Sequence, residues 1–405
     1  MISSELSANG TGKDFWSGFK PQGLFYAHIT GWGMAVPQKV VTNADLARMV
    51  DTSDEWIVSR TGIRQRYIAE GDESTASLAI DAARKALDMA DVAPEQIDLV
   101  IVATSTPQHF FPSTASIVQD ALGARNAGAF DLAAACTGFV YGLTMAAQGI
   151  KAGGMTTALV IGAETLSKIV NWEDRSTCVL FGDGAGAFVL QRSEQPGGIA
   201  TSLLRSDGSG GDLLSVPAGG SRMPASYETL RDNLHTIHMN GREVYRFATR
   251  VMSAACREVA AAAGIPVSEV DLIVPHQANR RIINAAQRAL RLSEDKFAIN
   301  VDRYGNTSTA SIPIAMCEAV EAGRVKPNDK VIFVAFGGGL TWGATLVEWD
   351  ATPPPELSRL QQVRRQTIYS MARVRSAVLR GARALEGAIW GSQSPAASEP
   401  PHRDN

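Results

Sequence analysis

A pattern of helix, turn and strand occurs twice in this chain, and the repeat constrains the fold more than any other feature. The first copy covers residues 82–101 and the second covers 255–274, and Asp98 and Asp271 open the two apolar strands. Helices that alternate with buried strands are typical of parallel α/β units. The pattern predicts a duplicated α/β protein, and chance similarity between alanine-rich segments is the alternative.

The repeat continues downstream of these strands. A helix from Thr137 leads to the strand 158–162, and a matching segment that starts near Asn306 leads to the strand 331–334. Cys136 and Asn306 are separated by nearly the same interval as the two aspartates and so occupy nearly equivalent corners of the two copies. A two-fold duplication brings such corners face to face. We therefore expect both residues in one site.

Composition excludes several classes of protein. The 405 residues are 45% apolar, enough for two packed halves of ordinary domain size. The net charge of −3 leaves no basic excess for a nucleic-acid-binding protein. The four cysteines form no C-x-x-C pair, and His235 and His238 lack a third ligand nearby, so we expect no metal site, no disulfide framework and a reduced, cytoplasmic protein.

The chain ends differ in composition from its middle. Residues 1–24 are polar and rich in Gly and Ser, which predicts a flexible extension without the apolar region of a secretory signal. After this extension we expect an N-terminal half, 25–200, which contains Cys136, and a C-terminal half, 201–350, which contains His276 and Asn306. No apolar run in the sequence approaches the ~18 residues of a membrane helix.

Cys136 is the candidate nucleophile. An apolar strand, 128–132, and a small-residue turn, 133–135, precede it, and a helix, 137–149, follows. A thiol at the N-terminal end of a helix is expected to have a lowered pKa, because the helix dipole favours the thiolate. The alternative is an inert cysteine packed among small side chains.

Two polar segments are candidates for the same site. His276 follows the second repeat's strand and begins the polar run 276–281, and the helix 280–290 comes next. Ligands collect at such strand ends in α/β folds, although a lone histidine is more often structural. The turn 302–308 contains Asn306 opposite Cys136, and ordinary turn chemistry also explains its Gly and Asn.

Two glycine-rich segments have different interpretations. Residues 337–339 end a buried strand, where the absence of side chains lets backbone N–H groups approach an oxyanion, although a tight strand reversal needs the same glycines. Residues 181–186 superficially resemble a dinucleotide-binding loop, but apolar strand-like residues flank them on both sides and no helix follows. We expect a hairpin there.

The motifs together resemble the β-ketoacyl-acyl-carrier-protein synthase III family of thiolase-like condensing enzymes. The resemblance extends from roughly Phe25 to Glu348. The matching segments, in order, are 52–64, the Cys136 corner, Asp174 and Arg175 before 181–184, 276–279, 305–307 and 337–339. The resemblance implies an α/β, five-layered αβαβα fold made from two duplicated halves, and a homodimer.

The resemblance also implies a reaction. Cys136 accepts an acyl group from acyl-CoA, preferably acetyl-CoA, while the N–H groups of Cys136 and Gly338 form the oxyanion hole. Malonyl-acyl-carrier protein then loses carbon dioxide, His276 and Asn306 stabilise the enolate, and 3-ketoacyl-acyl-carrier protein initiates fatty acid synthesis. A related acyltransferase of secondary metabolism that uses another acceptor is the alternative, and a non-catalytic partner subunit is a third possibility.

Binding residues follow from the same resemblance. No permanently bound cofactor is implied, and acyl-CoA is a substrate. The implied CoA-binding residues are Thr52, Trp56, Arg60, Arg175 and Asn279. The implied carrier-protein contacts are Arg280 and Arg281, for which surface solvation is the alternative, and the implied acyl-pocket residues are Phe111, from the partner subunit, Leu180 and Phe181. Arg242 departs from the small polar residue expected near the CoA tunnel.

The resemblance does not cover residues 351–405. A proline-rich linker, 352–355, precedes a segment with seven arginines and no acidic residue between Arg359 and Arg383, and apolar residues recur there at helical spacing. We expect a basic amphipathic helix followed by a disordered tail from 391 to 405. The helix is expected to pack on the body or another subunit, to bind the acidic carrier protein or to rest on an anionic membrane.

Overall fold

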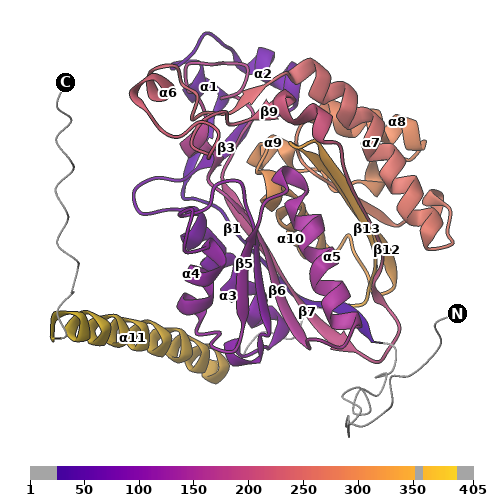
Figure 1. Cartoon of the computed structure of the whole chain (residues 1–405). Helices are drawn as coiled ribbons and strands as arrows, with labels where there is room; N and C mark the ends of the chain where they lie inside the picture. The colour runs from indigo at the N-terminus through magenta and orange to yellow at the C-terminus, as the bar shows by residue number, and fades with distance from the viewer. Residues whose placement is uncertain (1–24, 352–358, 390–405) are drawn as a thin grey trace, which may run out of the picture.

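The computed structural model describes residues 25–351 and 359–389 (Figure 1). The N-terminal extension expected over 1–24, the proline-rich linker and the tail expected over 391–405 lie outside the described residues. Within them, two β-sheets and the helices that cover them form one body, and a long C-terminal helix lies against one side of it.

The two sheets have corresponding strand orders. The first has five strands, in the order β1 (Tyr26–Ala35), β7 (Gly184–Ser193), β6 (Thr157–Glu164), β4 (Leu99–Ala103) and β5 (Gly128–Leu132). The second has four, in the order β8 (Gly198–Ser206), β13 (Thr341–Trp349), β12 (Asp329–Gly337) and β11 (Leu272–Pro275). In each sheet two antiparallel strands precede the parallel strands, which are three in the first sheet (β6, β4, β5) and two in the second (β12, β11).

The pairing register confirms the predicted duplication. Leu99 of β4 lies opposite Ala158 of β6, and Leu272 of β11 lies opposite Val331 of β12, so both strands of the pair recur at one and the same interval along the chain. The two aspartates identified in the sequence also have the same role. Asp98 accepts a hydrogen bond from the backbone N–H of Thr156 at 2.7 Å, and Asp271 accepts one from Lys330 at 2.8 Å.

Cys136 and Asn306 are not quite equivalent positions of the two copies, because Asn306 lies about one turn before the true counterpart of Cys136. Ala135 and Ser308, which are separated by that same interval, both have positive φ, 45° and 48°, and each begins the short 3₁₀ turn before a helix. The true counterpart of Cys136 is therefore Thr309, and Asn306 lies one turn before it. The corners still meet, because residues of both turns line one cavity.

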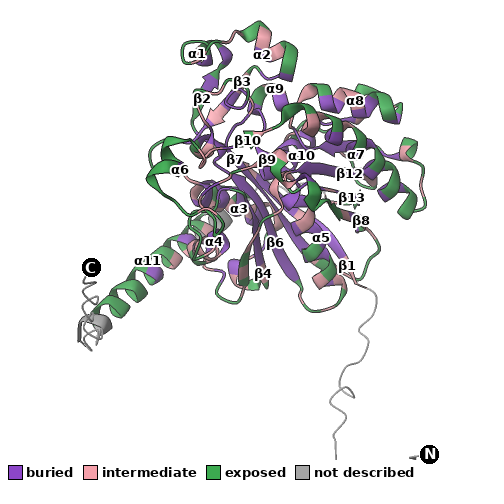
Figure 2. Ribbon diagram, turned by 45° about the horizontal axis from the view of Figure 1, so that its top comes forward, coloured by how far each residue is buried: buried purple, intermediate pink, exposed green. Residues whose placement is uncertain are grey.

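The layers follow the order αβαβα, as predicted. α3 (Thr75–Ala90) and α4 (Thr114–Leu122) cover the outer face of the first sheet, and α7 (Gly241–Ala262) and α8 (Arg280–Leu290) cover that of the second. α5 (Gly138–Lys151) and α10 (Ser311–Glu321) lie between the sheets (Figure 1). The central strands of both sheets are buried and the outer helices expose their outward faces (Figure 2).

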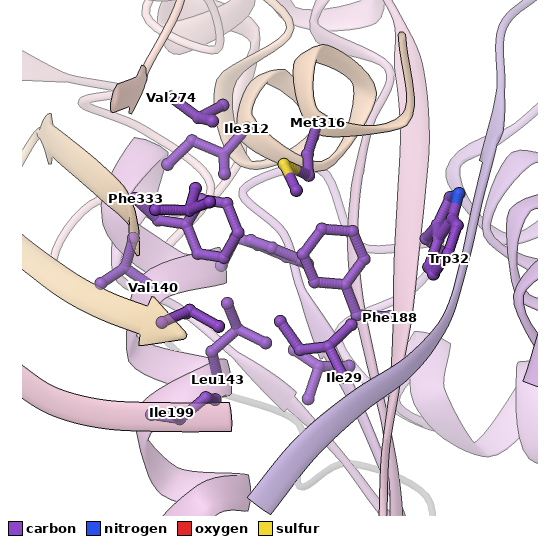
Figure 3. Packing of buried hydrophobic residues seen from close by; sticks show 14 of the residues in the cluster. Ile29, Trp32, Val140, Leu143, Phe188, Ile199, Val274, Ile312, Met316 and Phe333 are labelled. Carbon is purple, nitrogen blue, oxygen red and sulfur yellow. The ribbon is translucent and has the colours of Figure 1, made fainter. Parts of the chain in front are cut away.

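The core between the sheets is aromatic and aliphatic. Phe188 of β7 lies at its centre, with its ring centroid 5.1 Å from that of Phe139 and 5.8 Å from that of Phe333 (Figure 3). Each such fully buried side chain stabilises the fold by roughly 1.5–3 kcal/mol. Because α5 and α10 are packed on both sides, the turns that begin them are held in fixed positions. Those turns carry Cys136 and Ser308.

Smaller elements cap the sheets. They are β2 (Lys39–Thr42), α1 (Asn43–Leu46), α2 (Asp54–Thr61), β3 (Gln65–Ile68), β9 (Leu214–Ser215), α6 (Tyr227–Arg231), β10 (His238–Met239) and α9 (Val301–Tyr304). Short 3₁₀ turns occur at Pro94–Gln96, Ala135–Thr137, Leu166–Ile169, Gly208–Leu213, Val267–Glu269, Glu294–Lys296 and Ser308–Ala310. Figure 1 shows α1 and α2 at the end of the molecule opposite the C-terminal helix.

The expected hairpin at residues 181–186 is wrong. β7 begins only at Gly184, and the segment before it consists of turns, with one bridge that pairs Phe181 with Asn306. The buried Asp183 carboxylate holds this connection by accepting hydrogen bonds from the N–H groups of Ala69 and Ser167, at 2.7 and 2.9 Å. No helix opens there, so the segment is not a dinucleotide-binding loop either.

The C-terminal helix, α11 (Arg359–Ile389), packs on α3 and α4. The predicted amphipathic helix is thus present, and one of its faces contacts the body. None of the described helices combines the length and apolar character needed to cross a membrane.

Candidate active site

One cavity of about 350 Å³ collects the predicted catalytic residues. Cys136, His276, Asn306 and Gly338 all line it, so the structure brings these four positions together. Its walls come from both copies of the repeat and are mostly apolar. A concave, apolar cavity with a few converging polar groups is the usual form of a small-molecule site.

Cys136 lies in the 3₁₀ turn before α5, as expected, but its electrostatics differ from the expectation. Burial, together with the negative charge of Glu164, raises the pKa of the Cys136 thiol to about 12. A hydrogen bond with Ser308 partly opposes the rise in pKa. Desolvation thus outweighs the helix end on which the sequence-based expectation depended. At neutral pH the resting cysteine is a thiol.

The raised pKa of Cys136 predicts how its alkylation depends on pH. Because the thiolate is the reactive form, the rate of carboxamidomethylation by iodoacetamide should rise about tenfold per pH unit between about pH 7 and pH 9. Peptide mass spectrometry measures this rate, with Cys136→Ala as the control for the other cysteines. A plateau already present at neutral pH would show a low-pKa thiolate instead.

His276 follows β11 and is almost fully buried. Its Nδ1 lies 2.7 Å from the Ser311 hydroxyl, and its ring meets that of Phe336 edge-on with centroids 5.3 Å apart. Burial lowers the pKa of His276 to about 3. The imidazole is therefore neutral at physiological pH, which suits a hydrogen-bond donor and not a base.

Asn306 is held by its backbone and its side chain. Its N–H donates to the Leu180 carbonyl at 2.9 Å, and its carbonyl accepts from the Gly182 N–H at 3.0 Å. The Asn306 Oδ1 accepts the Ser308 N–H at 2.9 Å. Because the side-chain oxygen of Asn306 already accepts this hydrogen bond, its NH₂ group remains to donate hydrogen bonds into the cavity.

The glycines after β12 allow close approach of two backbones. A Cβ at Gly337 would lie 2.7 Å from the Cys136 nitrogen, and one at Gly338 would lie 3.0 Å from the Leu214 carbonyl oxygen. Gly339 has a φ of +133° and leads directly into β13, so the tight strand reversal is also present. Both sequence-based explanations of this segment therefore apply. The Gly338 backbone borders the cavity beside Cys136.

A buried carboxyl group that was not predicted from the sequence lies beneath this site. Glu164, at the end of β6, accepts hydrogen bonds from the Ser105 N–H at 3.1 Å and from the hydroxyls of Thr106 and Ser308 at 2.8 and 2.9 Å. Burial raises its pKa. An acidic residue that ends an otherwise apolar strand is the sequence signal that identifies such a position.

Comparison with known proteins decides the family. A family model described as 3-oxoacyl-[acyl-carrier-protein] synthase III matches residues 130–208, and its C-terminal counterpart matches 260–349. The β-ketoacyl-[acyl-carrier-protein] synthase III of Symbiobacterium thermophilum is 57% identical over 321 residues, 79% of this chain and 97% of that protein. The chain belongs to the β-ketoacyl-[acyl-carrier-protein] synthase III family.

Further relatives agree with this family assignment. The synthase III of Caldanaerobacter subterraneus is 54% identical over 323 residues, which are 80% of this chain and 98% of that protein. The crystal structure of the Aquifex aeolicus 3-oxoacyl-[acyl-carrier-protein] synthase III superposes with a TM-score of 0.75 at 49% identity, covering 80% of this chain and all of that one. The family models end at residue 349, so α11 lies beyond them.

Four of the predicted CoA-binding residues, Trp56, Arg60, Arg175 and Asn279, lie close to one another. The Trp56 ring centroid lies 5.9 Å from the Arg60 guanidinium carbon and 5.4 Å from that of Arg175. Asn279 lines the cavity and donates to the Arg60 carbonyl at 3.1 Å, which joins the two groups. The buried Thr52 hydroxyl has no hydrogen-bond partner among the described residues.

The predicted carrier-protein residues differ in their surroundings. Arg280 is half-buried and forms an ion pair with Glu294 at 2.5 Å, so part of its function is structural. Arg281 is exposed, with its guanidinium carbon 5.4 Å from the centroid of the Tyr245 ring. Arg242 is exposed in the first turn of α7, and the preceding Gly241 lines the cavity.

The predicted acyl-pocket residues are divided between the cavity and the surface. Leu180 and Phe181 line the cavity, whereas Phe111 is 87% exposed and does not line the cavity of its own chain. The histidines of the rejected metal pair have other partners. His235 lies 2.9 Å from the Thr229 hydroxyl, and His238 lies 3.2 Å from the Asn233 carbonyl oxygen.

Proposed function

We propose that this chain condenses an acyl-CoA with malonyl-acyl-carrier protein to give 3-ketoacyl-acyl-carrier protein, which initiates fatty acid synthesis. The observation that carries the proposal is the convergence of Cys136, His276 and Asn306 on one apolar cavity in a member of the synthase III family. The alternative, acyl transfer to another acceptor in secondary metabolism, is not favoured, because relatives with more than half of their residues identical are named β-ketoacyl-[acyl-carrier-protein] synthase III.

Cys136 acts as the nucleophile of the first half-reaction. Its sulfur attacks the carbonyl of the acyl-CoA thioester, the bond to the CoA sulfur breaks, and the thiol proton leaves with CoA. The backbone N–H groups of Cys136 and Gly338 form the oxyanion hole, a role supported by the side-chain-free approach of the two segments. The product is an acyl-Cys136 thioester.

His276 and Asn306 act in the second half-reaction. Both donate hydrogen bonds to the thioester oxygen of malonyl-carrier protein, and these bonds strengthen as the carboxylate leaves as carbon dioxide and an enolate forms. The enolate carbon attacks the acyl-Cys136 carbonyl, and the cysteine sulfur leaves and regains a proton.

Donation from His276 requires its proton on Nε2. The Ser311 hydroxyl lies 2.7 Å from Nδ1 and 2.8 Å from the Ser308 carbonyl oxygen, and it can donate to only one of them. In the proposed reaction it donates to Nδ1 and not to the Ser308 carbonyl oxygen, so the ring proton lies on Nε2, the nitrogen that the donor role needs. Ser311 is therefore the positioning residue for His276 in the proposed reaction.

Different residues bind the CoA, the acyl chain and the carrier protein. Trp56 stacks on the adenine of CoA, Arg60 and Arg175 hold its phosphates, and Thr52 and Asn279 support the same ligand. Leu180 and Phe181 bound the acyl chain, and acetyl is the proposed acyl group. Arg281 and Arg280 bind the acidic carrier protein through a contact that weakens with salt. The reaction uses no permanently bound cofactor.

The proposed assembly is a homodimer in the cytoplasm. β5 pairs only with β4 among the described strands, so one sheet edge is open. Phe110 and Phe111, in the connection between β4 and α4, are 85% and 87% exposed, which suits a subunit interface in which Phe111 reaches the partner's acyl pocket. The four free cysteines suit a reducing compartment.

The test uses purified full-length protein in two steps. Incubation with acetyl-CoA should add one acetyl group to the peptide that contains Cys136, as measured by peptide mass spectrometry. Addition of malonyl-carrier protein should then discharge that group, release carbon dioxide and form 3-ketoacyl-carrier protein. Acetylation without discharge, followed by transfer to a different acceptor, would support the secondary-metabolism alternative.

A further inference from the structure

α11 is attached to the body by one face. The Arg365 guanidinium forms an ion pair with Asp88 at 2.7 Å, and the Arg84 guanidinium carbon lies 5.0 Å from the centroid of the Tyr369 ring. Ser376 donates a hydrogen bond to Asp120 of α4. These contacts fix the orientation of the helix, and so they also fix which face points away from the protein.

The opposite face of α11 carries exposed apolar side chains. We name this set the apolar stripe, and each member is between 61% and 65% exposed: Val363, Met371, Val374, Val378 and Leu385. At 3.6 residues per turn these positions fall within an arc of about 80° and extend over about 33 Å of helix. Arg365, Tyr369 and Ser376 lie on the other side of the same helix. Figure 2 shows most of α11 coloured as exposed.

Arginines accompany the apolar stripe. Arg373 and Arg375 are exposed, and at 3.6 residues per turn they lie on either side of the stripe, about 120° and 80° from its centre. Arg365 and Arg380 instead pair with Asp88 and Asp120 of the body. A partner for this face must therefore accept apolar side chains in its middle and positive charge along both borders. An apolar face bordered by positive charge is typical of helices that lie in the plane of a membrane interface.

Other occupants fit these features less well. A second copy of α11 would bring arginine-bordered stripes together, and like charges along such a seam oppose pairing. Its seam would also include Thr367 and Gly381, which pack poorly in a helical pair. An acidic protein would satisfy the arginines but gives no reason for five exposed apolar side chains in one line.

We propose that α11 binds this protein to an anionic lipid surface, with the apolar stripe inserted among the acyl chains and the bordering arginines at the phosphate groups. The cavity stays accessible in this orientation. α11 lies at one end of the molecule, whereas α2 and α8, which carry the proposed CoA and carrier-protein residues, lie at the other (Figures 1 and 2). A surface-bound enzyme thus still receives its substrates from solution.

The experiment is co-sedimentation of the full-length protein with lipid vesicles. Vesicles of phosphatidylcholine alone are compared with vesicles that also contain phosphatidylglycerol, at low and high salt. We expect binding to the anionic vesicles, and its loss as salt screens the arginines. Met371→Gln should weaken the partition constant roughly five- to tenfold, the effect of removing one apolar side chain from the bilayer.

Met49→Gln is the matched control, since Met49 is also an exposed methionine, at 57%, but lies away from α11. It should bind vesicles as the unmodified chain does, and both variants should retain condensing activity. The triple variant Met371→Gln, Val374→Asn, Val378→Asn should not bind at all. Arg373→Gln with Arg375→Gln should reduce binding to the anionic vesicles several-fold.

Three results would overturn the proposal. The first is equal or absent sedimentation with the two vesicle types. The second is a change in molar mass by light scattering for the triple variant, which would assign the apolar stripe to a second copy. The third is loss of carrier-protein affinity in that variant without any vesicle binding by the unmodified chain, which would assign the face to the acidic protein.

Discussion

Replacing Cys136 by alanine is expected to abolish condensation, with a loss on the order of 10⁶ in turnover, as in other acyl transfer enzymes that lack their nucleophile. The cavity and its donors stay in place, but no sulfur remains to carry the acyl group. Intact-protein mass after incubation with acetyl-CoA should show no acetyl adduct. Decarboxylation of malonyl-carrier protein should persist at a low rate, because His276 and Asn306 still face the cavity.

Cys256→Ala is the matched control for this experiment. Cys256 is fully buried in α7 and does not line the cavity, so its replacement should cost a little stability and leave acetylation unchanged. An acetylated Cys136→Ala protein would rule out Cys136 as the acyl carrier. Loss of acetylation in both variants would point to a general folding defect instead.

The duplication was predictable because packing imposes it on the sequence. Each copy must place a helix, a turn and a buried strand in the same order, and Asp98 and Asp271 are required to accept the N–H of the neighbouring strand. Such local requirements leave a repeated pattern. The five layers follow, since apolar helices such as α5 and α10 are buried from two sides.

Relations that depend on long-range contacts were harder to predict. The sequence paired Cys136 with Asn306, but the positive-φ residues Ala135 and Ser308 show that the equivalent of Cys136 is Thr309. The hairpin expected before β7 failed because the Asp183 carboxylate bonds to residues far away in the sequence. The alternation of apolar residues in the sequence does not reveal those hydrogen-bond partners.

The electrostatics of the site were the least predictable part. A helix start predicts a lower thiol pKa, whereas burial raises the pKa of Cys136 to about 12. Burial depends on the whole cavity wall, including the segment that carries β9 and β10, which no motif marked. Ser311 and Glu164 were not predicted for the same reason, since their importance lies in what they contact.

His276→Ala is expected to separate the two half-reactions. Loss of one donor to the developing enolate should reduce decarboxylative condensation by about 10²–10³-fold. Acetyl transfer from CoA to Cys136 should change far less, because an imidazole whose pKa is lowered to about 3 by burial is too weak a base to activate the thiol. Single-turnover acetylation and carbon dioxide release measure the two steps independently.

The Ser311→Ala variant tests the same role of His276 by removing the hydroxyl that contacts Nδ1 of the ring. Without the Ser311 hydroxyl beside Nδ1, the proton is no longer held on Nε2, so condensation should fall about tenfold while acetylation stays unchanged. His276→Gln, which keeps an N–H donor, should recover part of the activity that alanine loses. If His276→Ala instead slows acetylation by the 10²–10⁴-fold typical of a lost general base, the neutral-donor role is wrong and His276 activates the cysteine.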